Sequence, residues 1–174
     1  MTFAITRPGK TRLILDTPVI AAAGTFGYGN LYDDIVDFSK VGAIVTNPVT
    51  YRPRLPARGP RVVPLDSGVL IHTGLPNAGV SKVIKRWNIQ WDKIDPPMIL
   101  HLVATTIEEI EKSLSIVDRT ETIAAVELGL NDDISWEAAA DYTEAAVRST
   151  EKPVIVRLPL HDAYEIAEAV ADAR

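Results

Sequence analysis

The sequence contains no cysteine in its 174 residues. This absence excludes disulfide bonds, thiolate metal ligands and a thiol that acts as nucleophile or base. A strong charge of one sign is also missing, because 18 lysines and arginines stand against 23 aspartates and glutamates, for a formal net charge of -5. Such a mild charge gives no electrostatic footprint for nucleic acid, so we expect no nucleic-acid partner. The expected compartment is the cytoplasm.

Long apolar runs are absent as well. Charged side chains at Arg7, Lys10 and Arg12 interrupt the opening segment, so its apolar stretches are too short for a signal peptide or a membrane span. We expect no targeting segment and no membrane contact. The histidines and carboxylates show no spacing that is typical of a metal site, and we predict that no metal is bound.

Short apolar runs rich in branched side chains are present, and they alternate with amphipathic segments. This alternation is typical of βα units around a parallel sheet. With 47% hydrophobic residues, the chain 1–174 fits a single α/β domain with a sizeable core. A further apolar run at residues 11–15 predicts part of an N-terminal hairpin. The five predicted strands are residues 18–23, 42–46, 97–103, 122–128 and 153–158.

The amphipathic segments carry signals for helix starts. Thr106 and Asp162 each stand three residues before a glutamate, which is the capping-box pattern. For the alanine-rich segment that runs to about Arg148, either Asp133 or Ser135 can serve as the N-cap. We therefore predict helices after the third, fourth and fifth strands.

One segment, residues 47–79, does not fit the alternation. It holds six prolines and four arginines, and we predict a long loop. Long loops inside a domain are uncommon and are usually functional or disordered, and this one would leave the carboxyl end of a strand, where barrel active sites lie. Arg54 and Arg61 in this loop either meet an anionic ligand or remain solvated.

Three segments, residues 21–29, 45–54 and 60–80, resemble the N-terminal half of dihydroorotate dehydrogenases, particularly the soluble bacterial class. A weaker similarity continues, in the family's order, through residues 105–115, 126–133 and 153–160. The resemblance implies an eight-stranded βα barrel that holds FMN at its carboxyl-terminal face, with dihydroorotate stacked against the flavin. Residues 1–174 match the first five βα units, which predicts a partial (β/α)8 TIM-type barrel with about five parallel strands and an N-terminal hairpin.

Positions that would contact ligands through the backbone are kept. The resemblance implies that Ala23 and Gly24 form the turn that approaches the flavin after the first strand. It also implies a loop near the substrate, formed by Gly74, Leu75, Pro76 and Asn77.

Positions that would contact ligands through side chains are mostly replaced. Asn47 stands where the family has a lysine near the flavin ring, and Ile71 stands where it has a substrate-binding asparagine. His101 and Gly129 each match a family asparagine, and Arg157 matches the lysine that steadies the reduced flavin. Only the change at Arg157 keeps the charge, and arginine does not replace lysine freely at a tight site.

The family's catalytic base, a cysteine or serine, has no equivalent here, and Asp132 and Asp133 lie at the aligned positions. The candidates for catalysis are therefore Asp132, His101 and Arg157. Each has an alternative structural interpretation. His101 is either a ligand or proton-transfer group or a satisfied core residue, the two aspartates either replace the base or cap a helix, and Arg157 either acts on a ligand or pairs with Glu127.

Three functions follow from these residues. The first is a degenerate relative of dihydroorotate dehydrogenase that lacks native activity on its own and acts as a subunit or small-molecule binding module. The second is an FMN-dependent oxidoreductase of the pyrimidine-biosynthesis type, acting on a CH–CH donor, with its remaining strands supplied by a longer chain or a partner. The third is a structural interaction protein. Because five strands do not close a barrel, we also expect self-association or a complementing subunit.

Overall fold

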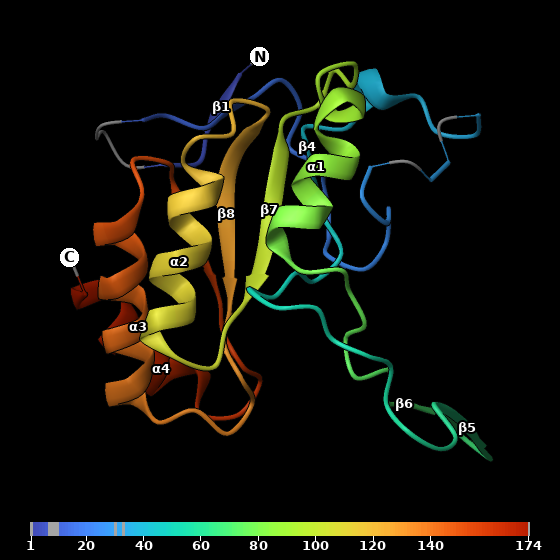
Figure 1. The fold of residues 1–174 in the computed structure, drawn as a ribbon, viewed down its shortest axis with the longest axis vertical. Coiled ribbons are helices and arrows are strands. Elements are labelled where there is room, and N and C mark those ends of the chain that lie inside the picture. Colours follow the sequence, from blue (N-terminus) through green and yellow to red (C-terminus); the bar gives the residue numbers. More distant parts are fainter. Residues whose placement is uncertain (1, 7–10, 30, 33, 174) are drawn as a thin grey trace.

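A five-stranded parallel sheet organises the computed structural model, which describes residues 2–6, 11–29, 31–32 and 34–173. The strands stand in chain order, and the sheet has the arrangement of part of a (β/α)8 barrel (Figure 1). All five predicted strands are confirmed; four have narrower bounds, with β3 reduced to two residues, and β8 is shifted by one residue. They are β3 (Ile20–Ala21), β4 (Ala43–Val45), β7 (Met98–Val103), β8 (Ile123–Gly129) and β9 (Val154–Arg157).

The expected N-terminal hairpin is also confirmed. Strands β1 (Phe3–Ala4) and β2 (Ile14–Leu15) pair antiparallel, with Phe3 opposite Leu15. Leu15 is almost fully buried and packs with Val45 and Ile99 of the sheet in one apolar cluster. The hairpin lies at the end of the sheet away from the strand arrowheads, so it covers the amino-terminal end (Figure 1).

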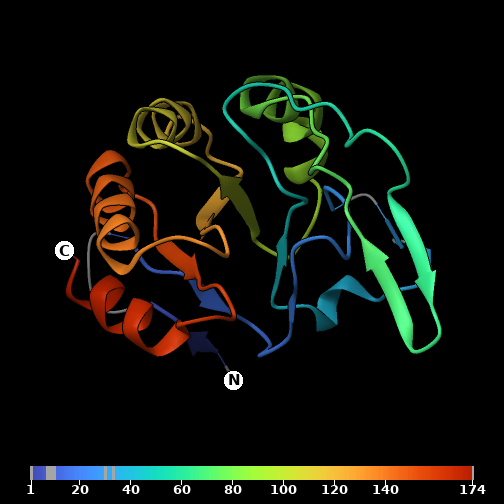
Figure 2. The same cartoon turned by 90° about the horizontal axis from the view of Figure 1, so that it is seen from below.

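Four α-helices form an arc along one side of the sheet (Figure 2). A larger apolar cluster joins the sheet to the first three of these helices, and it includes Leu100, Leu128 and Leu114. Burial of one such side chain contributes about 1.5–3 kcal/mol. All six residues of β7 are buried, as expected for a strand covered on both faces. The helices are α1 (Val80–Trp91), α2 (Ile107–Val117), α3 (Trp136–Ser149) and α4 (Ala163–Asp172), and a 3₁₀ helix spans Phe38–Lys40.

The predicted helix caps are found in two of the three cases. The Thr106 side chain accepts the backbone N–H of Glu109, while the Glu109 carboxylate turns back to the backbone N–H of Thr105. Ser135 caps α3 through its side chain. The cap predicted at Asp162 is wrong, because this residue adopts a left-handed conformation with φ of 55° and its side chain makes no capping hydrogen bond.

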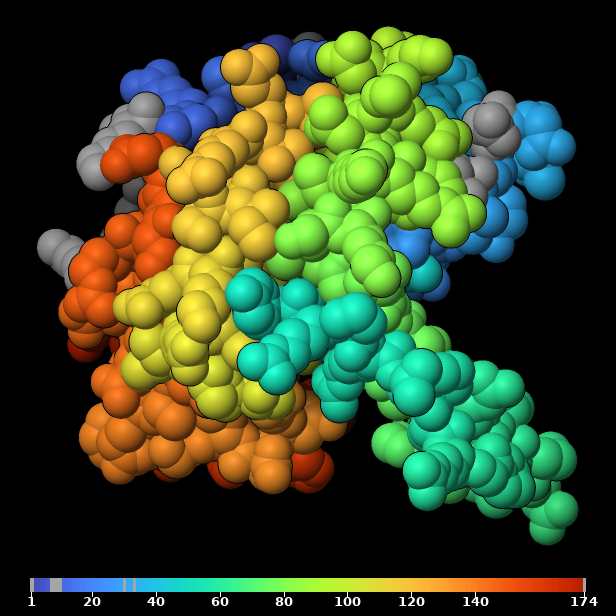
Figure 3. All heavy atoms as spheres, in the orientation of Figure 1, coloured from blue at the N-terminus to red at the C-terminus, as the bar shows by residue number. Residues whose placement is uncertain are grey.

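Residues 47–79 are not a loop throughout, and to that extent the prediction is wrong. Near the middle they form an antiparallel hairpin of β5 (Val62–Leu65) and β6 (Gly68–Ile71), joined by two residues. The hairpin projects away from the rest of the described chain (Figure 3), and all eight of its strand residues are exposed. At its base, the backbones of Arg54 and Asn77 exchange two hydrogen bonds of 3.0 and 3.1 Å.

No helix in the described ranges combines the length and apolar character that a membrane crossing requires.

Candidate functional site

A cavity of about 540 Å³ lies at the carboxyl ends of β7, β8 and β9. Parallel strands bring their carboxyl ends to one edge of the sheet, and alternate residues of each strand point to the same face. Polar and apolar groups therefore meet here from sequence positions far apart. The lining includes His101, Val103, Gly129, Leu130, Asp132 and Arg157.

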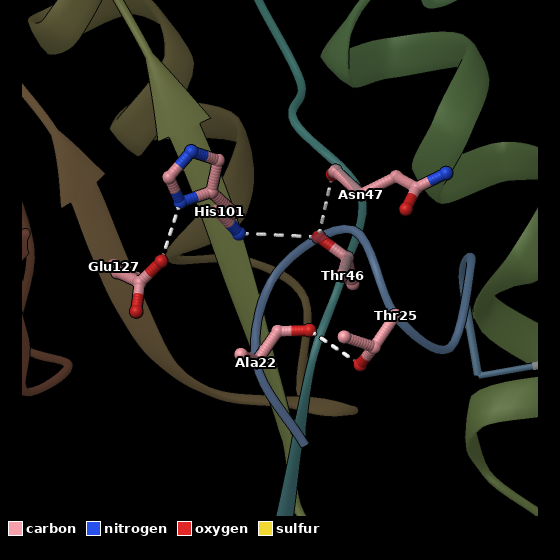
Figure 4. A network of polar contacts seen from close by, with 6 residues as sticks. All are labelled: Ala22, Thr25, Thr46, Asn47, His101 and Glu127. Atoms are coloured by element: carbon pink, nitrogen blue, oxygen red, sulfur yellow. Dashed lines mark hydrogen bonds and ion pairs between the residues drawn. The ribbon is translucent and has the colours of Figure 1, made fainter. Parts of the chain in front are cut away.

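His101 and Glu127 form a hydrogen-bonded pair in this part of the sheet. They stand directly opposite each other in the register of β7 and β8, and Nδ1 of His101 lies 2.6 Å from Oε1 of Glu127 (Figure 4). The backbone N–H of His101 donates to Oγ1 of Thr46 at 3.1 Å. Only 3% of the His101 side chain is exposed. A buried imidazole held on one side by a carboxylate has a fixed orientation.

The expected ion pair between Glu127 and Arg157 is wrong. Glu127 stands opposite Ile155 on β9, and Arg157 stands opposite Gly129, two pairs further along the strands. The carboxylate of Glu127 instead meets His101 on the other neighbouring strand. Arg157 is exposed and lines the cavity, where its guanidinium remains available for an anion.

Gly129 gives the imidazole its space. A Cβ added at this position would lie 2.8 Å from Cε1 and 2.9 Å from Nε2 of His101. Real Cβ atoms do not approach other atoms so closely without a shift of one group. The ring of His101 therefore occupies the room in which a side chain at position 129 would stand.

Asp132 lines the cavity and Asp133 does not. Both are exposed and lie in the turn between β8 and α3. The capping role predicted for this pair is wrong, because Oγ of Ser135 accepts the backbone N–H that needs a partner at the start of α3. Asp132 thus brings a carboxylate to the same cavity as His101 and Arg157.

The turn after β3 and the end of β4 lie beside the cavity lining without belonging to it. Gly24 has φ of 89°, and a Cβ added there would meet no atom within 4 Å. Oγ1 of Thr25 donates to the carbonyl of Ala22 at 2.7 Å, which closes the turn that contains Ala23. The backbone N–H of Asn47, just after β4, donates to the carbonyl of Gly27 at 2.6 Å, and the side chain of Asn47 points away from His101 (Figure 4).

Of the predicted substrate loop, Leu75 reaches the cavity, and Gly74, Pro76 and Asn77 are not among its lining residues. The amide of Asn77 is used within the chain. Its Oδ1 accepts the backbone N–H of Gly79 at 2.9 Å and that of Thr50 at 3.2 Å, and its Nδ2 donates to the carbonyl of Leu75 at 3.0 Å. These bonds hold the base of the projecting segment.

Two residues of the site were missing from the sequence-based set: Glu127 as the partner of His101, and Gly129 as the source of its space. A signal for both residues was present in the sequence. Glu127 and Gly129 are two positions apart on β8, as His101 and Val103 are on β7, so each pair points to one face of the sheet. Only the register between the strands identifies which side chains meet. In the described part of the chain, no three His, Cys, Asp or Glu residues gather as a metal site would require.

The sequence that forms these strands and this cavity matches a known protein family. The family model for dihydroorotate dehydrogenase matches residues 11–173. The chain belongs to the dihydroorotate dehydrogenase family. One relative is the catalytic subunit of dihydroorotate dehydrogenase B (NAD(+)) from Geotalea daltonii, 32% identical over 91% of this chain. The subunit of the same name from Desulforamulus reducens is 34% identical over 93% of this chain. The chain spans 56% and 57% of the lengths of these relatives.

In this member of the dihydroorotate dehydrogenase family, the side chains of the cavity can form hydrogen bonds, transfer a proton and attract a charged group. His101 supplies an imidazole, Asp132 a carboxylate and Arg157 a guanidinium to one cavity. Arg157 is the single Lys or Arg among the described lining residues, so the lining offers one positively charged side chain to the phosphate of FMN.

Proposed function

We propose that this member of the dihydroorotate dehydrogenase family binds a small molecule at the carboxyl end of its sheet and does not oxidise dihydroorotate on its own. In this proposal the chain acts as a subunit of a larger assembly or as a module that binds a small molecule. One observation carries the proposal. His101, paired with Glu127, and Gly129, whose place the imidazole fills, stand where the resemblance implies two asparagines. Replacing such amides leaves polar groups of the expected substrate without partners, at about 1–3 kcal/mol each.

The position of the family's base strengthens this proposal. Its cysteine or serine is matched by a region that contains Asp132, which lies on an exposed turn. A positioned general base is worth roughly 10²–10⁴-fold in rate. The carboxylate of Asp132 receives no hydrogen bond from the described residues, so its orientation is less fixed than that of a positioned base. Native turnover by this chain is therefore expected to be absent.

A second function is favoured by one observation: His101, Asp132 and Arg157 gather in a single cavity. With the rest of a barrel supplied, the chain would be part of an FMN-dependent oxidoreductase acting on another substrate. FMN would supply the acceptor for a hydride. Ala23, Gly24 and Asn47 would then lie on its side of the site, Arg157 would hold negative charge, and His101 or Asp132 would accept a proton.

The proposal includes a partner or a second copy. The β5–β6 hairpin exposes Val62, Leu65, Leu70 and Ile71, each more than half exposed. An isolated two-stranded hairpin is marginal in water, and exposed apolar strands favour association. The open strand β9 is only partly buried, which supports the same interpretation. Cytoplasmic location stays a prediction.

The test uses the purified chain. We expect no flavin absorbance after purification and no orotate formed from dihydroorotate when FMN and an electron acceptor are added. Tightly held FMN together with turnover would contradict the proposal. For the second function, the chain is co-expressed with the carboxyl-terminal segment of the Desulforamulus reducens relative that it does not match. Flavin absorbance that appears with this segment, and disappears in Arg157→Gln, would favour the oxidoreductase.

A further inference from the structure

The imidazole of His101 has one nitrogen with a partner and one without. Nδ1 is bonded to Glu127, while Nε2 has no hydrogen-bond partner among the described residues. The side chain is 3% exposed and the residue lines the cavity. Among the described residues, the fully buried side-chain atom without a partner is Oγ of Ser113, so Nε2 of His101 is accessible from the cavity, where a ligand can bond to it.

Glu127 decides which nitrogen faces the cavity. An ionised carboxylate only accepts hydrogen bonds, so Nδ1 must carry a hydrogen at a separation of 2.6 Å. In the neutral ring, Nε2 then holds a lone pair. Because the two residues are paired in register on adjacent strands, the backbone itself fixes this orientation. Glu127 is therefore a positioning residue for His101.

Gly129 accommodates the ring of His101. It lies on β8 opposite Val103 of β7 and opposite Arg157 of β9. The imidazole occupies the space in which a side chain at position 129 would stand, and His101 and Arg157 both line the cavity. A small ligand in the cavity therefore borders both residues. Asp132 is the remaining charged group of the lining.

We propose that Nε2 of His101 is the hydrogen-bonding and proton-accepting atom of this cavity, and that the ligand is a small ring or chain with an N–H or O–H and an anionic group. This inference rests on the proposed small-molecule site. The N–H or O–H of the ligand bonds to Nε2, and the anionic group bonds to Arg157. When the proton moves to Nε2, its bonding electrons stay on the ligand and the carboxylate of Glu127 stabilises the imidazolium.

The first test needs no ligand. The chain has three histidines, so a His72→Gln and His161→Gln background leaves one imidazole for nitrogen NMR. We expect the neutral ring of His101 to carry its hydrogen on Nδ1. Glu127→Gln should abolish this preference, since an amide both donates and accepts. Asp132→Asn, which alters a carboxylate of the same cavity without a bond to His101, should preserve it. A hydrogen found on Nε2, or no effect of Glu127→Gln, overturns the proposal.

The second test uses orotate and uracil, which share a ring and differ in the carboxylate. We expect orotate to shift the Nε2 signal of His101, and His101→Gln to weaken orotate binding about tenfold, as the loss of one hydrogen bond implies. Arg157→Gln should weaken orotate and leave uracil unchanged. Gly129→Ala, which removes neither polar group, should weaken both by displacing the imidazole of His101.

Three results overturn the proposal: no orotate binding by the folded parent chain, an Nε2 signal that orotate does not move, or equal orotate binding by folded His101→Gln. Circular dichroism establishes the folding of each variant. If His101→Gln does not fold, the tautomer and the effects of Gly129→Ala and Arg157→Gln decide. Dihydroorotate turnover is measured separately, so a chain that turns over contradicts the proposed function without deciding the role of His101.

Discussion

The ring of His101 and the backbone of Gly129 share one space between neighbouring strands: a Cβ at position 129 would lie 2.8 Å from Cε1 of the imidazole. The two positions are therefore coupled. A larger side chain at one of them requires a smaller or displaced side chain at the other. The two asparagines implied by the family resemblance are one solution to this packing, and histidine beside glycine is another.

Gly129→Ala tests this coupling. We expect the substitution to lower the free energy of unfolding by about 1–3 kcal/mol, because the added methyl group displaces the buried imidazole. In a His101→Ala background the same substitution should cost much less. Urea unfolding of the four proteins in this double-mutant cycle gives the coupling energy. Costs that simply add would show that the two positions are independent.

A second prediction concerns pH and the helix α2. Oδ1 of Asp118 accepts hydrogen bonds from Oγ1 of Thr150 at 2.7 Å and from the backbone N–H of Glu151 at 2.9 Å. These bonds hold the pKa of the Asp118 carboxyl below its ordinary value of 3.8, with the Thr150 bond as the larger cause. The ionised form thus stabilises the fold at neutral pH, and this contribution is lost as pH falls below 3.8 through the folded-state pKa.

Asp118→Asn should therefore destabilise the chain by about 1 kcal/mol or less at pH 7, since the carboxylate is exposed. The gap in unfolding free energy between parent and variant should narrow as pH falls from 5 toward about 3. Asp141→Asn, at an exposed position on α3, serves as the control and should leave the pH dependence unchanged. A gap that widens on acidification would contradict the assignment.

A third prediction concerns the base of the projecting segment. Asn77→Ala removes the acceptor for the backbone N–H groups of Thr50 and Gly79 and the donor to Leu75. We expect a loss of about 1–3 kcal/mol, and faster proteolytic cleavage within residues 52–76 than elsewhere. Asn131→Ala, on an exposed turn, should leave both measurements unchanged. Equal cleavage of both variants would count against the bracing role.

The exposed hairpin gives a fourth prediction. If the β5–β6 strands carry self-association, Leu70→Asp should shift the molecular mass measured by light scattering toward the monomer, because a charge is costly in an apolar interface. Leu70 is 60% exposed, so folding of the single chain should be little changed. Ile89→Asp, at a residue 72% exposed on α1, is the matched control. A parent chain that is already monomeric would contradict self-association through this hairpin and would indicate a different protein as its partner.

The fold was largely predictable because its central strands β4 and β7 are buried on both faces. Continuous apolar runs such as Met98–Val103 appear in the sequence as strands without any knowledge of their partners. The β5–β6 hairpin lacked this signal. Its residues are exposed, and Pro64 sits within β5, where proline argues against a strand in sequence-based reasoning.

The site was predictable in its location and only partly in its contacts. His101, Asp132 and Arg157 belong to one cavity because each lies near the carboxyl end of a strand or just after it. The partner of Glu127 could not be predicted, since candidates stand on both neighbouring strands. A register shift between Met98 and Ile99 brings His101 directly opposite Glu127, and no pattern of residue types announces such a shift.

Strand pairing is unequal across the sheet. All six residues of β7 have a partner on β8, whereas β3 and β4 share two paired positions. Amide hydrogens in the centre of the sheet should therefore be the last to exchange with deuterium, and those near Ile20 among the first. The floor under Gly129 therefore belongs to the best-paired part of the sheet, and a molecule that enters the cavity meets a backbone held by strands on both sides.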